Sequence, residues 1–331
     1  MIKKIYITFV VFSILYGQSE KYGGGPNAFY QLQTSAREAA LGGAGIVTAT
    51  GPFAALWNPS LIADISSVKE KSWTFGVNLP WQSSDNNFNL STTKGISMFS
   101  LGILHRYIYD DNKNLFIGGN IVHRSFNDVI HTDLNINNEI QPIDDPKDYS
   151  QNLMMISIAG YFNKIKAGAA IKSVISDMPG IDRIQINGID AGYKLILIEN
   201  KWVIIDAIEQ GFVVKLDMDT RNTQMRYGWG MNFDFKDIGS VDINLASDIF
   251  SGENTNTEWA TGCEVKYSDT AFLRAGINYE VNNSNSPRYW SLGGGLKYEQ
   301  FIISGSYTPN YSEYLSLVDF PIKLDIIIKL N

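Results

Sequence analysis

Long stretches in which apolar and polar residues alternate constrain the fold of this chain more than any other feature. From Met225 to Phe235 every second residue is apolar or aromatic, and the residues between them are Arg, Gly, Asn or Asp. Similar alternation recurs at 271–279, 290–298 and 322–330. Successive side chains of a β-strand point to opposite faces, so each stretch predicts a strand with one apolar and one polar face.

The length of these stretches indicates a membrane rather than water. They run for about ten residues, which suits a tilted strand crossing a bilayer, whereas strands of soluble proteins are nearer five or six. Aromatic residues lie at both ends of several apolar faces, for example Trp290 with Tyr298 and Phe301 with Tyr307. Such rings are typical of interfacial girdles, and short turns alternate with longer loops as in outer-membrane barrels. The fold class predicted is all-β: a transmembrane antiparallel β-barrel.

About fourteen strands can be counted, an even number that returns both chain ends to the periplasmic side. Asn87–Thr93 is assigned to a loop on this parity. Arg124–Gln151, the longest polar insert, is predicted to be extracellular. The alternation of apolar and polar residues is weakest over 176–210. There, Lys201–Ile205 is either an extra strand or a turn at the membrane surface. The predicted strands are 72–79, 96–106, 114–124, 152–162, 165–174, 192–199, 211–219, 224–235, 239–248, 257–267, 270–280, 288–298, 300–308 and 321–330.

The N-terminus has the form of a secretory signal. Lys3 and Lys4 precede an apolar run, 5–16, that is too short to span a bilayer, and cleavage is placed near Gly17 to Ser19. The alternative is a buried N-terminal strand. The chain is therefore divided into a signal peptide (1–18), a leader and plug (19–71) and an outer-membrane barrel (72–331).

Residues 29–63 are the one compact helical stretch of the mature chain. Ser35–Leu41 predicts a short helix that Gly42 ends through a left-handed cap, and Pro52 and Pro59 bound a second one. Polar strand faces imply a lumen, and this module is the segment suited to fill it as a plug, or hatch. The predicted plug residues are Arg37, Glu38, Gly42, Gly43, Trp57, Asn58 and Pro59.

The charges of Arg37 and Glu38 can be read in two ways. Enclosed in a lumen, both would be desolvated and would need partners, for which Arg226, Arg274 and Asp242 on inward faces are candidates. Alternatively, they form a solvated pair on an exposed helix. Glycine clusters such as Gly293–Gly295 are predicted to allow strand bending or close approach by the plug.

Composition excludes several functions. The chain carries 27 basic and 34 acidic residues, the opposite sign to a nucleic-acid-binding surface. Its one cysteine, Cys263, is predicted to face lipid and be inert. His105, His123 and His131 lack metal-ligand spacing, 144–148 lacks the pattern of a calcium loop, and there is no G-x-S-x-G motif. No catalytic residue, metal or cofactor is predicted, and the protein is predicted not to be an enzyme.

The motifs S-A-R-E-A-A-L-G-G-A-G (Ser35–Gly45) and A-L-W-N-P-S-L-I-A (Ala55–Ala63), followed by a barrel pattern, resemble the PorV/PorQ family. These outer-membrane barrels are related to the FadL long-chain fatty acid transporters. The resemblance implies fourteen strands with the N-terminal segment folded inside as a plug. Asn58-Pro59-Ser60 lies where FadL relatives carry an Asn-Pro-Ala motif in the hatch.

The resemblance implies an outer-membrane protein of a Gram-negative bacterium, in contact with outer-membrane lipid, with two possible functions. The first is a type IX-like secretion role, docking or shuttling cargo proteins or secretion-system components. The alternative is FadL-like passive transport of a hydrophobic small-molecule ligand. A third reading, from the residues alone, is a secreted soluble β-sandwich or propeller used for adhesion.

Overall fold

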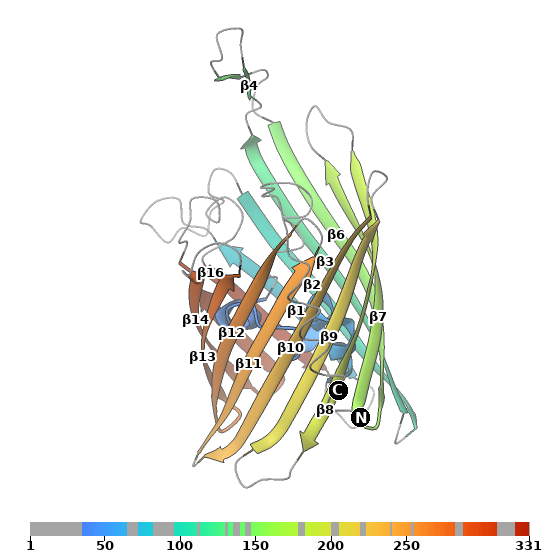
Figure 1. Cartoon of the computed structure of the whole chain (residues 1–331), viewed down its shortest axis with the longest axis vertical. Coiled ribbons are helices and arrows are strands. Elements are labelled where there is room, and N and C mark those ends of the chain that lie inside the picture. The colour runs from blue at the N-terminus through green and yellow to red at the C-terminus, as the bar shows by residue number, and fades with distance from the viewer. Residues whose placement is uncertain are drawn as a thin grey trace.

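The barrel contains fourteen antiparallel strands and closes on itself (Figure 1). The structure is a computed structural model that describes residues 35–64, 72–81, 96–110, 113–129, 132–134, 140–142, 147–177, 183–199, 205–218, 223–238, 240–252, 255–281, 287–309 and 322–330. The barrel strands are β1 (Ser72–Trp81), β2 (Ile96–Asp110), β3 (Lys113–Val129), β6 (Lys147–Phe162), β7 (Ile165–Asp177), β8 (Ile184–Glu199), β9 (Ile205–Met218), β10 (Thr223–Ile238), β11 (Val241–Gly252), β12 (Thr255–Tyr267), β13 (Ala271–Glu280), β14 (Pro287–Tyr298), β15 (Phe301–Tyr307) and β16 (Ile322–Leu330).

Barrel strands pair with their neighbours in the chain, and β1 pairs with β16 to close the wall. At this seam Phe75 lies opposite Ile328, and Val77 lies opposite Ile326. The predicted closed barrel is confirmed, and each of the fourteen predicted segments corresponds to one of its strands. The soluble sandwich or propeller is wrong, because the wall closes into one sheet.

The region 124–151 is more regular than predicted, so its assignment as one loop is wrong. β3 continues to Val129 and β6 begins at Lys147, while β4 (Thr132–Leu134) pairs with β5 (Ile140–Pro142) above the barrel (Figure 1). The ladder extends through polar pairs such as Ser125 with Ser150. Strand ends beyond a bilayer need no apolar face, so the alternation that reveals a strand fades there.

Because the alternation is weak over 176–210, the predicted strand 192–199 omits the first half of β8 (Ile184–Glu199). This strand starts at Ile184, eight residues before the predicted start at 192. Its outward residues Gln185 and Asn187 are polar and exposed, which removes the apolar face that the pattern search needs. Ile205 begins β9, whereas 201–204 and Asn87–Thr93 lie outside the described residues.

The two faces of the wall differ as the alternation predicts. Outward residues such as Ile156, Ile171 and Leu273 are more than 60% exposed although they are large and apolar. Buried inward residues are largely polar or charged, among them Lys172, Glu264 and others on most strands. An apolar outer band around a polar interior is the arrangement that a bilayer requires of a barrel.

No helix in the described part of the chain is long and apolar enough to cross a membrane.

Residues 35–64, here called the plug, lie inside the barrel and appear in blue in Figure 1. They form α3 (Ala36–Ala40), η1 (Gly51–Phe53), α4 (Ala54–Trp57) and η2 (Pro59–Asp64). Gly42 and Gly43 have φ of +70° and +91°, which glycine adopts without steric cost after a helix. The predicted stop before Pro59 ends α4, but a 3₁₀ helix follows it directly. The predicted end of the signal peptide at residue 18 and the predicted end of the leader and plug at residue 71 stay predictions.

Candidate functional site: the plug and the wall it contacts

A buried ion network joins the plug to the wall at Arg37. Its guanidinium donates two hydrogen bonds to the Glu264 carboxylate on β12, Nε to Oε2 at 3.1 Å and Nη2 to Oε1 at 3.0 Å. Arg274 on β13 donates to the same carboxylate at 2.5 Å. Glu38 accepts from Arg37 at 3.1 Å and contacts Ser35. Bidentate, charge-assisted bonds of this kind fix geometry as well as supplying energy, so they set where α3 lies.

Of the residues predicted as partners of the Arg37–Glu38 pair, only Arg274 belongs to this network. Arg274 joins the network, but through Glu264, which the sequence analysis missed. Arg226 instead pairs with Asp217 at 2.9 Å, in a second buried cluster where Lys172 lies 2.6 Å from Asp190. Asp242 lies opposite Lys266 on β12. The alternation could have identified Glu264, since Cys263 is outward and its neighbour must therefore point inward.

Wall side chains also hold the backbone of α3 and the turn after it. The Asp325 carboxylate on β16 accepts from the Ala36 and Arg37 amides at 2.8 and 3.4 Å. The Gly42 amide donates to the Ser291 hydroxyl at 3.0 Å. Asn278 and Tyr289 donate to the Gly42 carbonyl, each at 3.2 Å. These bonds satisfy main-chain groups that the short helix leaves unpaired at its ends.

Glycines of the wall let the plug backbone approach closely. A Cβ at Gly276 on β13 would overlap the backbone of Leu41 and Gly42. One at Gly168 on β7 would lie 2.6 Å from the Pro59 carbonyl, and one at Gly293 would lie 2.5 Å from the Ala40 Cβ. Similar positions recur around the lumen at Gly76, Gly102, Gly192, Gly211, Gly228 and Gly262. Inward glycines therefore form a ring shaped to the plug, which is the close approach predicted for Gly293.

The Asn58 side chain links two segments of the plug through hydrogen bonds. Its amide nitrogen donates to the Ile46 carbonyl at 3.0 Å, and its oxygen accepts from the Ser60 amide and hydroxyl at 3.1 and 2.8 Å. The residue is fully buried. The Trp57 ring packs on Gly45, where a Cβ would be 2.5 Å from the ring, and Pro59 lies on Gly168. Gly43 donates to the Glu38 carbonyl at 2.9 Å. Each residue predicted for the plug thus makes a defined contact in the lumen.

Asn58→Leu is expected to loosen the plug while leaving the barrel closed. The leucine fills similar space but leaves the Ile46 carbonyl and the Ser60 amide without their partner, at about 1–3 kcal/mol for each buried group. Amide hydrogen exchange of 46–60 should accelerate, with wall strands still protected. The control is Ser60→Ala, which removes one bond to Asn58 and should have a smaller effect. Unchanged exchange in Asn58→Leu would remove Asn58 from the set that holds the plug.

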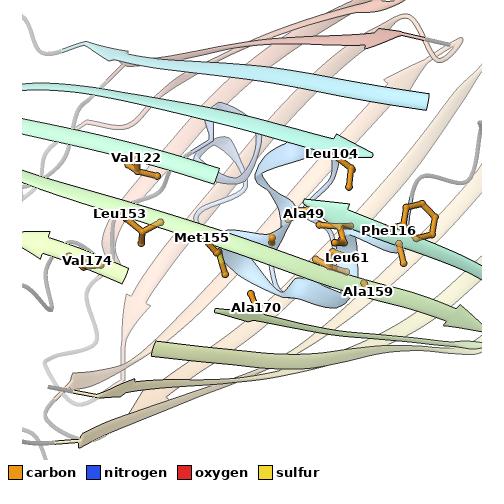
Figure 2. Packing of buried hydrophobic residues seen from close by; sticks show 14 of the residues in the cluster. Ala49, Leu61, Leu104, Phe116, Val122, Leu153, Met155, Ala159, Ala170 and Val174 are labelled. Atoms are coloured by element: carbon orange, nitrogen blue, oxygen red, sulfur yellow. The ribbon is translucent and has the colours of Figure 1, made fainter. Parts of the chain in front are cut away.

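The plug is held differently along its length. Residues 35–48, here the anchored half, carry the hydrogen bonds and ion pairs to Glu264, Ser291 and Asp325. Residues 49–64, here the apolar half, accept hydrogen bonds from Asn120 to the Pro52 carbonyl at 2.7 Å and from Lys215 to the Leu56 carbonyl. They are otherwise held mainly by apolar contacts, and Ala49, Ala54, Ala55, Leu61, Ile62 and Ala63 belong to one apolar cluster. Figure 2 shows this cluster continuing onto the inner face of β2, β3, β6 and β7 through Leu104, Phe116, Val122, Leu153, Met155, Ala159, Ala170 and Val174.

Other residues considered in the sequence have structural contacts. The His105 ring stacks on Trp73 with centroids 4.1 Å apart, and His123 lies 2.7 Å from the Asn152 side-chain oxygen. Cys263 is a free, partly exposed thiol on the outward face of β12. His131 lies outside the described residues. Over the described ranges no group of three potential metal ligands comes together.

Comparison with known proteins places the fold. No family profile and no curated protein matches the chain. Among solved structures, the deltaS2S3 mutant of the TodX monoaromatic hydrocarbon channel matches with a TM-score of 0.52 and 9% identity, over 89% of this chain and 96% of that one. A Pseudomonas aeruginosa FadL homologue matches at TM-score 0.46 and 10% identity, over 90% and 98%. A porin from Rh. blastica matches at TM-score 0.34 and 9% identity, over 78% and 98%.

At such low identity, the likeness to the TodX channel shows a shared barrel fold and no more.

Proposed function

We propose that the protein is an outer-membrane channel that passes small hydrophobic molecules past a plug. The observation that carries the proposal is the apolar surface inside an otherwise polar lumen. Val122, Leu153 and Val174 point inward, are at most 5% exposed, and join the apolar half of the plug in one cluster. A purely aqueous pore has no use for such a lining, whereas a hydrophobic molecule binds to apolar walls.

The uneven attachment of the plug supports a gate. Its anchored half is tied by charge-assisted bonds, which are directional and strong when buried. Its apolar half lies on side chains that a hydrophobic molecule could contact in its place. Apolar contacts are non-directional, and fewer hydrogen bonds join the second half to the wall than the first, among them those from Asn120 to the Pro52 carbonyl and from Lys215 to the Leu56 carbonyl. The second half can therefore shift against the wall at a smaller cost than the first. The fold shared with a monoaromatic hydrocarbon channel is consistent with this proposal.

The secretion role implied by the PorV/PorQ resemblance stays a prediction. The residues that carry that resemblance, 35–45 and 55–63, are ones that fix the plug in the lumen, and either role would use them. Type IX-like cargo or components as partners are therefore kept as an outcome of the experiment below.

Uptake of radiolabelled naphthalene by cells tests the proposal. The double variant Leu153→Asn, Val174→Asn removes apolar contact from the lumen and should reduce uptake about thirtyfold, at about 1 kcal/mol for each side chain. Ser176→Ala, inward on the same strand β7, should leave uptake unchanged. Normal uptake in the double variant would contradict the proposal. A secretion defect with normal uptake would favour the docking role.

Residence in the outer membrane has a separate readout. The unboiled protein should migrate differently from the boiled protein on a denaturing gel, because a closed strand network resists detergent until heated. Extraction by carbonate without detergent would contradict membrane insertion.

A further inference from the structure

One register row of the wall changes from polar to apolar as it crosses the lumen. Its inward residues lie opposite one another in turn on neighbouring strands, and each is at most 5% exposed. We call them the mixed row: Ser304, Asp325, Asn78, Ser100, Val122, Leu153, Val174 and Ile186. Figure 2 shows the apolar members Val122, Leu153 and Val174 on three neighbouring strands. The change of character falls between Ser100 on β2 and Val122 on β3.

Two polar atoms beside this boundary, the Ser100 hydroxyl and the Asn78 side-chain oxygen, have no hydrogen-bond partner among the described residues. Both residues are fully buried. The two atoms do not bond each other, although their residues are register partners. A buried polar group without a partner is costly, so we expect a polar group from outside the wall to reach these atoms.

A third oxygen without a partner in the described part of the chain belongs to the Asn120 side chain on β3. Asn120 is 2% exposed and lies opposite Gly102, two residues along β2 from Ser100. It is therefore a diagonal cross-strand neighbour of Ser100, at roughly 7–8 Å. The three unpartnered oxygens thus form one small patch on β1, β2 and β3, at the edge of the apolar surface.

The nitrogens of both amides are already used, and this fixes what a ligand must offer. The Asn78 nitrogen donates to the Asp325 carboxylate at 2.6 Å, and the Asn120 nitrogen donates to the Pro52 carbonyl at 2.7 Å. Each free amide oxygen can therefore only accept, whereas the Ser100 hydroxyl can donate and accept. A hydroxyl group satisfies this set because it also does both. A carboxylate does not, because it offers no donor to the amide oxygens.

The plug lies against this patch. A Cβ at Gly102 would be 2.9 Å from the Pro52 Cβ, and one at Gly76 would be 2.5 Å from the Pro52 Cγ. Gly76 and Gly102 are each two residues from a member of the patch, Asn78 and Ser100, on the same strand face. Pro52 belongs to the apolar half of the plug. A shift of that half would therefore uncover the polar patch together with the apolar side chains.

We propose that the molecule that passes the plug carries a hydroxyl group on an apolar body, as phenols and long-chain alcohols do. Its hydroxyl binds Ser100 and the free amide oxygens of Asn78 and Asn120, while its body lies on Val122 and Leu153. Directly opposed cross-strand residues are about 5 Å apart, so one small molecule reaches both parts. This inference rests on the proposed channel function and narrows its substrate class.

Binding of three matched compounds tests the inference. The full chain in nanodiscs is dialysed to equilibrium against naphthalene, 2-naphthol or 2-naphthoate near neutral pH, with binding to empty nanodiscs subtracted. We expect 2-naphthol to bind at least about tenfold more tightly than naphthalene, because it gains two neutral hydrogen bonds, and more tightly than 2-naphthoate. Ser100→Ala should weaken 2-naphthol binding about fivefold, the effect of one such bond, and leave naphthalene binding unchanged.

Ser306→Ala is the matched control. The Ser306 hydroxyl is likewise buried, points inward and has no hydrogen-bond partner over the described ranges. It lies opposite Gly293 and Lys323, and its strand β15 is four strands from Val122 on β3. Removing it should leave the binding of all three compounds unchanged. Neither serine hydroxyl bonds to another described residue, so both variants should fold as closed barrels, which gel migration checks.

Three outcomes would overturn the inference. One is equal affinity of the unaltered protein for naphthalene and 2-naphthol. Another is 2-naphthol binding that Ser100→Ala leaves unchanged, which would assign the free oxygens to ordered water. The third is tighter binding of 2-naphthoate than of 2-naphthol, which would assign the patch to an anion. Each of these leaves naphthalene uptake by cells unaffected, whereas a loss of the channel function would appear in that uptake, so the two proposals can fail separately.

Discussion

Replacing Glu264 by glutamine is expected to release the anchored half of the plug from the wall. Glu264 is almost fully buried and is the shared acceptor of Arg37 and Arg274. Its neutralisation removes the charge that lies between Arg37 and Arg274 and leaves Arg37 with Glu38 as its remaining ion-pair partner. Breaking a buried pair from one side costs about 3–5 kcal/mol. Hydrogen exchange of 36–48 and protease cleavage within the plug should both increase strongly, while the wall strands stay protected.

The control for this prediction is the same substitution in an exposed pair. Glu199→Gln removes a partner 3.9 Å from Lys164, and both side chains are nearly half exposed, so the expected cost is at most about 1 kcal/mol. Adding Arg37→Gln to Glu264→Gln should cost less than the sum of the two single changes, because the pair is lost once. If Glu264→Gln behaves like Glu199→Gln, the ion network does not hold the plug.

Gly276→Ala is expected to prevent the plug from seating at all. A methyl group there would occupy the space of the Leu41 and Gly42 backbone, and neither β13 nor the turn can move without losing the bonds to Ser291 and Asn278. Overpacking of a rigid contact costs about 1–3 kcal/mol before those bonds are counted. The barrel should still show heat-modifiable migration, with plug amides exchanging as in an open chain.

Gly305→Ala provides the comparison for Gly276→Ala. Gly305 lies on β15, and its added Cβ would meet its nearest atom, the Lys323 carbonyl oxygen, at an ordinary 3.9 Å. Exchange of the plug should therefore match that of the unaltered protein. Equal loss of plug protection in both variants would mean that strand flexibility, and not the close contact at Gly276, sets the seating of the plug.

Much of this fold could be predicted because a barrel strand carries its own signature. Alternation alone located all fourteen barrel strands, and it failed at Gln185 and Asn187, where the outward residues are polar. Strand parity gives the inward direction of Glu264, but not its meeting with Arg37, 227 residues away. That meeting depends on the stagger of the strands around the barrel, which no single strand encodes.

The sequence predicted strand bending or close approach by the plug at Gly293–Gly295, but not at Gly76, Gly168 or Gly276. These three glycines lie on separate strands, and their shared role is visible only when the closed wall brings each of them against the plug.

Asp325 has a consequence for assembly. One of its oxygens accepts from the plug amides at 2.8 and 3.4 Å, and the other accepts from Asn78 on β1 at 2.6 Å. Asp325 itself belongs to β16, so a single carboxylate joins the first strand, the last strand and the segment between the leader and β1. Pairing of the seam and docking of the plug are thus coupled equilibria. Whatever stabilises one raises the population of the other, and an unplugged chain has a weaker closing edge.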